Sequence, residues 1–282
     1  SSVLLASSEI FNPAATNSLP AASLATARRL HTATALSNGK VLVVGGLGSS
    51  GALSTAELYD PATNAWSAAG FLATARQLHT ATLLPDGKVL VAGGLGTAAL
   101  STSELYDPAS NTWTASGSLA SARQLHTASL LSSGKVLVTG GLDTDILNSS
   151  EIYDPATGLW TGAAPLTTLR QQHTATVLTD GKVLVTGGLT SIPGPVFSNL
   201  ASAELYDPAT NVWTGAGALT AARRLHTATR LPGGKVLVAG GTSSITAVPS
   251  PALNSAQLYD PLSNTWATAG SLGGISAYHT AN

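Results

Sequence analysis

The chain has 282 residues, of which 44% are hydrophobic and only 10% are charged, and its formal net charge at pH 7 is −1. This charge balance does not support a nucleic-acid partner, because nucleic-acid-binding proteins present a basic face. No apolar run approaches the roughly 18 residues of a membrane-spanning helix. The chain has no cysteine, which excludes disulfides, thiolate metal sites and cysteine nucleophiles. Low charge and many small residues predict an extracellular protein of bacterial origin.

The first recognisable segment is LLASSEIFNP at residues 4–13, which aligns with ALSTAELYDP at 52–61. It is a degenerate copy, because Phe11-Asn12 replaces Tyr-Asp and Leu19 stands where later copies are expected to have tryptophan. We interpret residues 1–22 as the last two strands of a repeat unit that the chain enters partway.

Five full units follow, with a histidine every 47 to 53 residues. A fixed period of this length is the signature of a repeat architecture. The tryptophans, the Gly-Gly pairs and the Tyr-Asp-Pro triplets keep the same period. The units are predicted at about 25–70, 71–117, 118–164, 165–217 and 218–270.

Each full unit predicts four short strands. The first resembles LHTATLL, and a two-residue hairpin turn such as Asp86-Gly87 follows, at which Gly, Asn and Asp tolerate positive φ. The second, KVLVAGG, is an apolar run typical of a strand buried on both faces. The third, STAELYD, ends at a proline, which cannot donate to a ladder. The fourth carries the tryptophan, and the unit is therefore an antiparallel meander.

The C-terminal segment YHTAN at 278–282 is a sixth copy of the first strand. The chain thus has six first strands and six third strands but only five second strands. We expect residues 1–22 and 274–282 to form one composite closing unit. Its second strand could come from the chain beyond Asn282, from Ser2–Ala6 or from another chain, and we favour the first source.

The Gly-Gly after an apolar strand, the tyrosine about 12–18 residues later and the tryptophan seven residues after the tyrosine resemble the kelch repeat. The resemblance covers nearly the whole chain. It implies an all-β, six-bladed kelch-type β-propeller with four-stranded antiparallel blades, whose ring closes through the composite blade. The repeats are similar to those of secreted bacterial kelch proteins, which share the fold of the galactose oxidase central domain. The copper chemistry of that enzyme requires a cysteine-crosslinked tyrosine, so no cofactor is expected here.

Most charged residues follow the repeat. A residue that recurs in every blade is spread around a ring, whereas a catalytic centre needs different residues that converge on one place. We therefore predict that the arginine three residues before each histidine pairs with the glutamate of the third strand, and that the histidine bonds to backbone. A ring of six metal-binding histidines is the alternative. Structural roles are assigned to the repeat positions Arg76, His79, Glu104, Trp113, Arg123 and His126.

Candidate ligand-binding residues lie where the repeats differ. Two residues before each histidine the side chain varies, which predicts a polar collar at one channel mouth. The connections at 189–203 and 242–256, which are longer than their counterparts, are expected on the same rim. A calcium site at Asp143 and Asp145 has too few acids to be favoured. The predicted ligand-binding residues are Arg29, Gln77, Gln124, Gln171, Arg224 and Tyr278.

These features favour a non-catalytic, secreted or cell-surface binding propeller that contacts a protein or a glycan through this rim. No catalytic residue, metal or cofactor is predicted. Two alternatives stay open: a subunit of a self-assembling extracellular structure, and a kelch-type isomerase that uses residues at the channel mouth.

Overall fold

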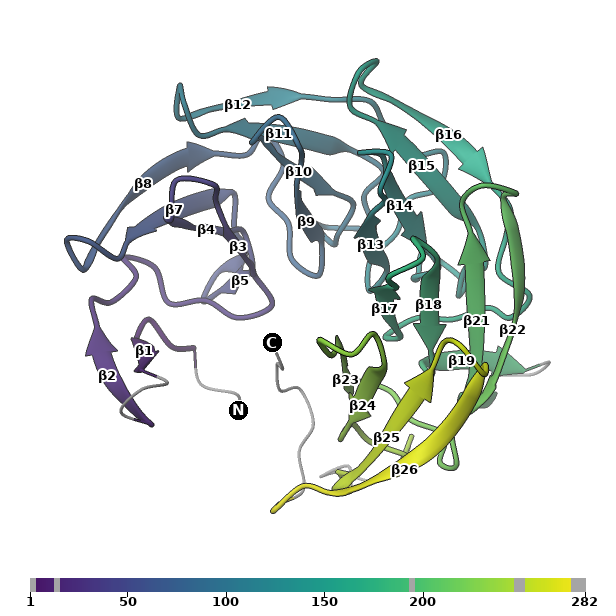
Figure 1. Ribbon diagram of the computed structural model, residues 1–282. Helices are drawn as coiled ribbons and strands as arrows, with labels where there is room; N and C mark the ends of the chain where they lie inside the picture. Colours follow the sequence, from purple (N-terminus) through teal and green to yellow (C-terminus); the bar gives the residue numbers. More distant parts are fainter. Residues whose placement is uncertain (1–3, 13–15, 193–195, 246–251, 275–282) are drawn as a thin grey trace. The chain divides into compact units, whose positions relative to one another are not determined.

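A computed structural model describes residues 4–12, 16–192, 196–245 and 252–274 (Figure 1). Within these ranges the chain forms 26 β-strands and no helix, which confirms the all-β prediction. None of the described segments is a helix long and apolar enough to cross a membrane. The chain divides into two compact units, residues 1–124 with 155–159 and residues 125–154 with 160–282.

The first unit contains two four-stranded antiparallel sheets, each with its strands in chain order, and two hairpins. One sheet consists of β3 (Thr32–Ala35), β4 (Val41–Val44), β7 (Thr55–Asp60) and β8 (Ala65–Phe71). The other consists of β9 (Thr80–Leu83), β10 (Val89–Ala92), β11 (Ser103–Asp107) and β12 (Thr112–Ala115). The hairpins are β1 (Ser8–Asn12) with β2 (Asn17–Ala21), and β5 (Leu47–Gly48) with β6 (Gly51–Ala52).

Three more four-stranded sheets follow. Their strands are β13 (Thr127–Leu130), β14 (Val136–Thr139), β15 (Ser150–Asp154) and β16 (Leu159–Ala163); β17 (Thr174–Val177), β18 (Val183–Thr186), β21 (Ser202–Asp207) and β22 (Val212–Ala218); and β23 (Thr227–Arg230), β24 (Val236–Ala239), β25 (Ser255–Asp260) and β26 (Thr265–Ser271). A hairpin of β19 (Leu189–Ile192) and β20 (Val196–Asn199) occupies the connection at 189–203. The predicted four-stranded unit is confirmed in all five repeats. The composite unit involves 275–282, outside the described residues, so six blades and ring closure stay predictions.

Within each unit, successive sheets pack face to face through their second strands. In the first unit, Leu42 and Val44 of β4 lie in one apolar cluster with Val89 and Val91 of β10 and with Tyr106 of β11. Both faces of such a strand are therefore buried, which explains the unbroken apolar sequence. Each buried valine or leucine contributes about 1.5–3 kcal/mol to folding.

The turn between the first two strands differs from the prediction. The Leu36 N–H donates to the Lys40 carbonyl at 2.8 Å, and the Gly39 N–H donates to the Leu36 carbonyl at 3.0 Å. Only Gly39 has positive φ, 81°. The predicted two-residue turn is wrong, because the loop has three residues, a tight turn followed by a left-handed glycine. Asn38 contributes through its side chain, whose Oδ1 accepts the Lys40 N–H at 3.1 Å.

The register of β1 corrects a second prediction. Phe11 pairs with Ser18 across the β1–β2 hairpin, as Tyr59 pairs with Trp66 in the first full blade. Ser18, and not Leu19, therefore occupies the tryptophan position of the degenerate copy.

Candidate functional site

The repeated arginine is a structural crosslink within its blade. Arg76 is fully buried. It donates to the carbonyls of Gly93 and Thr102 at 2.8 and 3.0 Å and to a Glu104 oxygen at 2.7 Å. Glu104 also accepts the backbone N–H of Ala73 at 2.7 Å. The same ion pair recurs at 2.6 Å between Arg28 and Glu57 and between Arg170 and Glu204. The predicted arginine–glutamate pairing is confirmed, and these guanidinium groups have no free face for a ligand.

The last blade departs from this pattern. Arg223 is also fully buried, but Gln257 replaces the glutamate. Arg223 donates to the carbonyls of Gly240 and Ser255 and to the Ser255 hydroxyl, the last at 2.8 Å. Burial lowers the pKa of Arg223. The Gln257 amide nitrogen is buried with no hydrogen-bond partner.

The repeated histidines bond to threonine side chains rather than to backbone, which corrects the prediction. His79 Nε2 lies 2.9 Å from the hydroxyl of Thr32 in the preceding blade, and His173 Nε2 lies 2.9 Å from that of Thr127. Burial, together with the charges of Arg76 and His31, lowers the pKa of His79 to about 3. Burial also lowers the pKa of His173 well below its ordinary value.

These histidines are therefore neutral and join neighbouring blades. Among the described residues, no group of three or more His, Asp or Glu side chains is arranged to hold a metal ion. Arg123 and His126, which were also assigned structural roles, are buried like their counterparts in the other blades.

The tyrosine and tryptophan of each blade pack against each other. The ring centroids of Tyr106 and Trp113 lie 5.1 Å apart. The Trp113 indole N–H donates to the carbonyl of Ala69 in the preceding blade at 2.7 Å, so the side chain also joins two blades. Half-buried and bonded in this way, Trp113 is a packing residue and not an exposed platform for sugar.

The collar residues lie beside the connections that leave the second strands. Four of them form backbone bridges to the residue after a Gly-Gly pair: Arg29 to Leu47, Gln77 to Leu95, Gln171 to Leu189 and Arg224 to Thr242. Leu189 and Thr242 begin the two long connections. Gln124 is half-buried. Tyr278 lies outside the described residues.

In the second unit, Arg224 is the centre of a polar cluster. Its guanidinium donates to Gln172 Oε1 at 3.0 Å and to the Ser244 carbonyl at 3.4 Å. Gln171 is 4% exposed, and its Oε1 has no hydrogen-bond partner within the described part of the chain. Gln172 was missed by the sequence analysis. The sequence does mark this residue, because Gln172 stands where the other four full units have leucine: Leu30, Leu78, Leu125 and Leu225.

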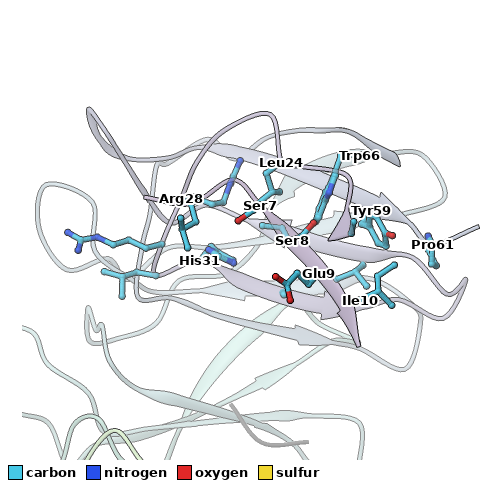
Figure 2. A pocket seen from close by; sticks show the side chains of 17 residues that line it. Ser7, Ser8, Glu9, Ile10, Leu24, Arg28, His31, Tyr59, Pro61 and Trp66 are labelled. Atoms are coloured by element: carbon cyan, nitrogen blue, oxygen red, sulfur yellow. The ribbon is translucent and has the colours of Figure 1, made fainter. Parts of the chain in front are cut away.

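A cavity of about 780 Å³ lies between the β1–β2 hairpin and the first full blade. Figure 2 shows Ile10 of β1 on one side, with Tyr59 and Trp66 of the blade on the other. Arg29 and His31 also line it. The missing second strand of this repeat is evident from the sequence, but the cavity was not predicted.

Comparisons with known proteins agree with the repeat pattern. The family profile described as the Kelch motif matches residues 28–70, 126–167 and 223–273. No curated protein matches the chain. A solved structure titled "Structure of YjhT" is similar with a TM-score of 0.73 at 15% identity, over 90% of this chain and 88% of that one. At this identity the likeness concerns the fold alone.

Proposed function

Because the chain is a kelch-repeat protein with the β-propeller fold, we propose that it is a non-catalytic binding module for a protein or glycan partner. Kelch propellers generally mediate protein interactions. The proposed contact surface is the rim formed by the connections between second and third strands. The proposal includes six blades and an extracellular location, the latter supported by low charge and small-residue composition.

The Arg224 cluster carries this proposal. The terminal nitrogens of the buried repeat arginines donate to acceptors within their own blades. Arg224, in contrast, contacts only a neutral amide and a carbonyl among the described residues. A half-buried guanidinium without a carboxylate partner favours an anionic ligand, since charge-assisted bonds to carboxylate are about twice as strong as neutral ones.

The two long connections also expose apolar side chains. Val196 and Phe197 of the β19–β20 hairpin are 49% and 46% exposed, and Ile245 in the next long connection is 42% exposed. Apolar side chains beside a polar anchor are typical of interaction surfaces. We therefore propose that the ligand carries a carboxylate, as an acidic peptide or an oligosaccharide with uronic acids does.

The test is an array of acidic and neutral oligosaccharides and peptides, probed with the unmodified protein and two variants. Arg224→Gln should weaken binding to the carboxylate ligands at least tenfold. Arg230→Gln removes the same charge from an exposed residue at the opposite end of β23 and should leave binding unchanged. Equal losses in both variants would show nonspecific charge attraction and overturn the assignment.

A second candidate function is a subunit of an extracellular assembly. The edge of β1 favours it, because among the described residues this strand pairs only with β2. Mass in solution separates the two candidates. A binding module should be a monodisperse monomer, whereas an assembly subunit should form larger species as concentration rises.

A further inference from the structure

The turn between the first two strands of the first full blade contains the only Asn-Gly dipeptide of the sequence, Asn38-Gly39. The side-chain amide of an asparagine can be attacked by the backbone nitrogen of the next residue, and glycine hinders this approach least because it has no Cβ. Asn38 and Gly39 are both exposed. A Cβ at Gly39 would meet no atom within 4 Å, so the tip of the loop has open space in which a ring can form.

The asparagines at the turns between third and fourth strands differ from Asn38 in two respects. Each accepts the hydroxyl of the tyrosine of its own blade at 2.9 Å, which holds the side chain in place. Each is followed by alanine, threonine or valine, whose side chain hinders the approach of the backbone nitrogen. These asparagines are Asn64, Asn111, Asn211 and Asn264.

Two backbone N–H groups act on the reacting atoms of Asn38. The Lys40 N–H donates to Asn38 Oδ1 at 3.1 Å. A donor at this oxygen stabilises the negative charge that develops on it when the side-chain carbon is attacked. The Gly39 N–H donates to the Leu36 carbonyl at 3.0 Å, and this bond must open before the nitrogen can attack. Because exposed loop tips open locally at low free energy, the reaction does not require the sheet to unfold.

We propose that Asn38 is a site of spontaneous deamidation, at which the folded protein converts the asparagine into aspartate. Hydroxide removes the proton of the Gly39 nitrogen, which forms a bond to Asn38 Cγ. The bond from Cγ to the side-chain nitrogen breaks, and that nitrogen takes a proton from water and leaves as ammonia. Water then attacks Cγ of the resulting five-membered imide and breaks its bond to the Gly39 nitrogen, which regains its proton. The net reaction consumes one water and releases one ammonia.

The other blades show that aspartate fits this turn. Asp86 and Asp180 stand at the position of Asn38 in the second and fourth full blades. The Oδ1 atom of each accepts the N–H of the lysine two residues later at 3.1 Å, the distance found for Asn38. The glycine that follows also has nearly the same φ, 81° at Gly39 and 86° at Gly87. The product therefore keeps the hydrogen bond and the backbone of the turn.

The lysine of the turn can accommodate the new charge. In the fourth full blade the Lys182 ammonium lies 3.9 Å from an Asp180 oxygen and 3.8 Å from an Asp207 oxygen, so one lysine is shared by two acids. The Lys40 ammonium already lies 3.0 Å from an Asp60 oxygen. Aspartate at position 38 would give Lys40 its second acid. The reaction also adds one negative charge to a chain whose formal net charge is −1.

The hairpin also selects between two products. Attack of water on the main-chain carbonyl of the imide would instead give isoaspartate, which adds a methylene to the backbone. The ends of the loop are fixed, because the Leu36 N–H donates to the Lys40 carbonyl at 2.8 Å and Ala35 pairs with Val41. A longer backbone does not fit a three-residue loop closed in this way. We therefore expect mainly aspartate from the folded protein and a larger share of isoaspartate from an unfolded chain.

The test incubates the folded protein at pH 8 and follows ammonia release, isoelectric focusing and peptide mapping. Asn38 should lose its amide at least tenfold faster than any other asparagine, and the isoelectric point of the protein should fall. The rate should rise with pH, because hydroxide removes the Gly39 proton. Asn38→Ser copies Ser133 of the third full blade, so it should fold normally and should abolish the rapid release of ammonia.

Two comparisons separate the effect of the turn from that of the dipeptide. Incubation in urea should raise the share of isoaspartate at Asn38 at least threefold over that in the folded protein. Asp86, in the same turn, should form isoaspartate more slowly than Asn38 forms aspartate, because its carboxylate is ionised at pH 8 and is a weak electrophile. Loss of the amide no faster at Asn38 than at Asn111 would overturn the proposed site. Equal shares of isoaspartate from folded and unfolded protein would overturn the selection of aspartate by the hairpin.

Discussion

Replacing Gln257 by glutamate should stabilise the protein. In the second full blade, the two oxygens of Glu104 accept from three donors. One oxygen accepts from the Arg76 guanidinium at 2.7 Å and from the Thr74 N–H at 3.3 Å, and the other accepts from the Ala73 N–H at 2.7 Å. Gln257 has only one oxygen, which accepts the Thr220 N–H at 3.0 Å. Its amide nitrogen takes the place of the second oxygen and remains buried without an acceptor. Rotating the Gln257 amide by a half turn would not help, because the Thr220 N–H would then lack its acceptor.

The expected gain follows from what the substitution removes and adds. An unsatisfied buried donor costs about 1–3 kcal/mol, and a hydrogen bond to a charged group contributes about 1.5–3 kcal/mol. Burying a carboxylate carries a desolvation penalty of several kcal/mol. The fully buried Arg223 cation and the Thr220 N–H offset most of that penalty. We expect Gln257→Glu to raise the free energy of unfolding by about 2 kcal/mol.

Urea denaturation at pH 7 measures this change as a shift of the midpoint at constant slope. The matched control is Glu104→Gln, which reproduces the last-blade arrangement in an intact blade and should lower the free energy of unfolding by a similar amount. A neutral or destabilising Gln257→Glu, with a well-tolerated Glu104→Gln, would refute the reasoning. It would mean that the glutamates are retained for something other than the arginine pair.

Two further predictions concern the contacts between blades. The free energy of unfolding should fall as the pH drops from about 6.5 toward about 3. In this range the histidine of the unfolded chain binds a proton, whereas buried His79 in the folded protein stays neutral. The expected slope is on the order of 1.4 kcal/mol per pH unit for each such histidine. Urea titrations between pH 7 and pH 4 measure it, and a profile as steep in His79→Gln as in the unmodified protein would contradict it. Trp113→Ala should cost about 3–5 kcal/mol, and a calorimetric loss below about 1 kcal/mol would instead indicate an exposed ring.

The sequence by itself determined the repeat, the strand types and the strand order within each blade. These follow from short-range physics: an apolar run such as the one ending at Val44 needs burial on both faces, and a proline ends the third strand. The arginine–glutamate pair was also predictable, because buried charges are tolerated only when paired, and both residues keep the period in four of the five full blades. Local patterns were less decisive at the turns, where Asn38-Gly39 fits a two-residue and a three-residue loop equally well.

Only the tertiary structure decided which groups meet between repeats. His79 hydrogen-bonds to the hydroxyl of Thr32, 47 residues earlier, and Arg224 donates to the side chain of Gln172, 52 residues earlier. The cavity beside β1 likewise exists only once the first blade has folded against the hairpin. Backbone preference and hydrophobic period act over a few residues, whereas these contacts depend on how whole sheets pack.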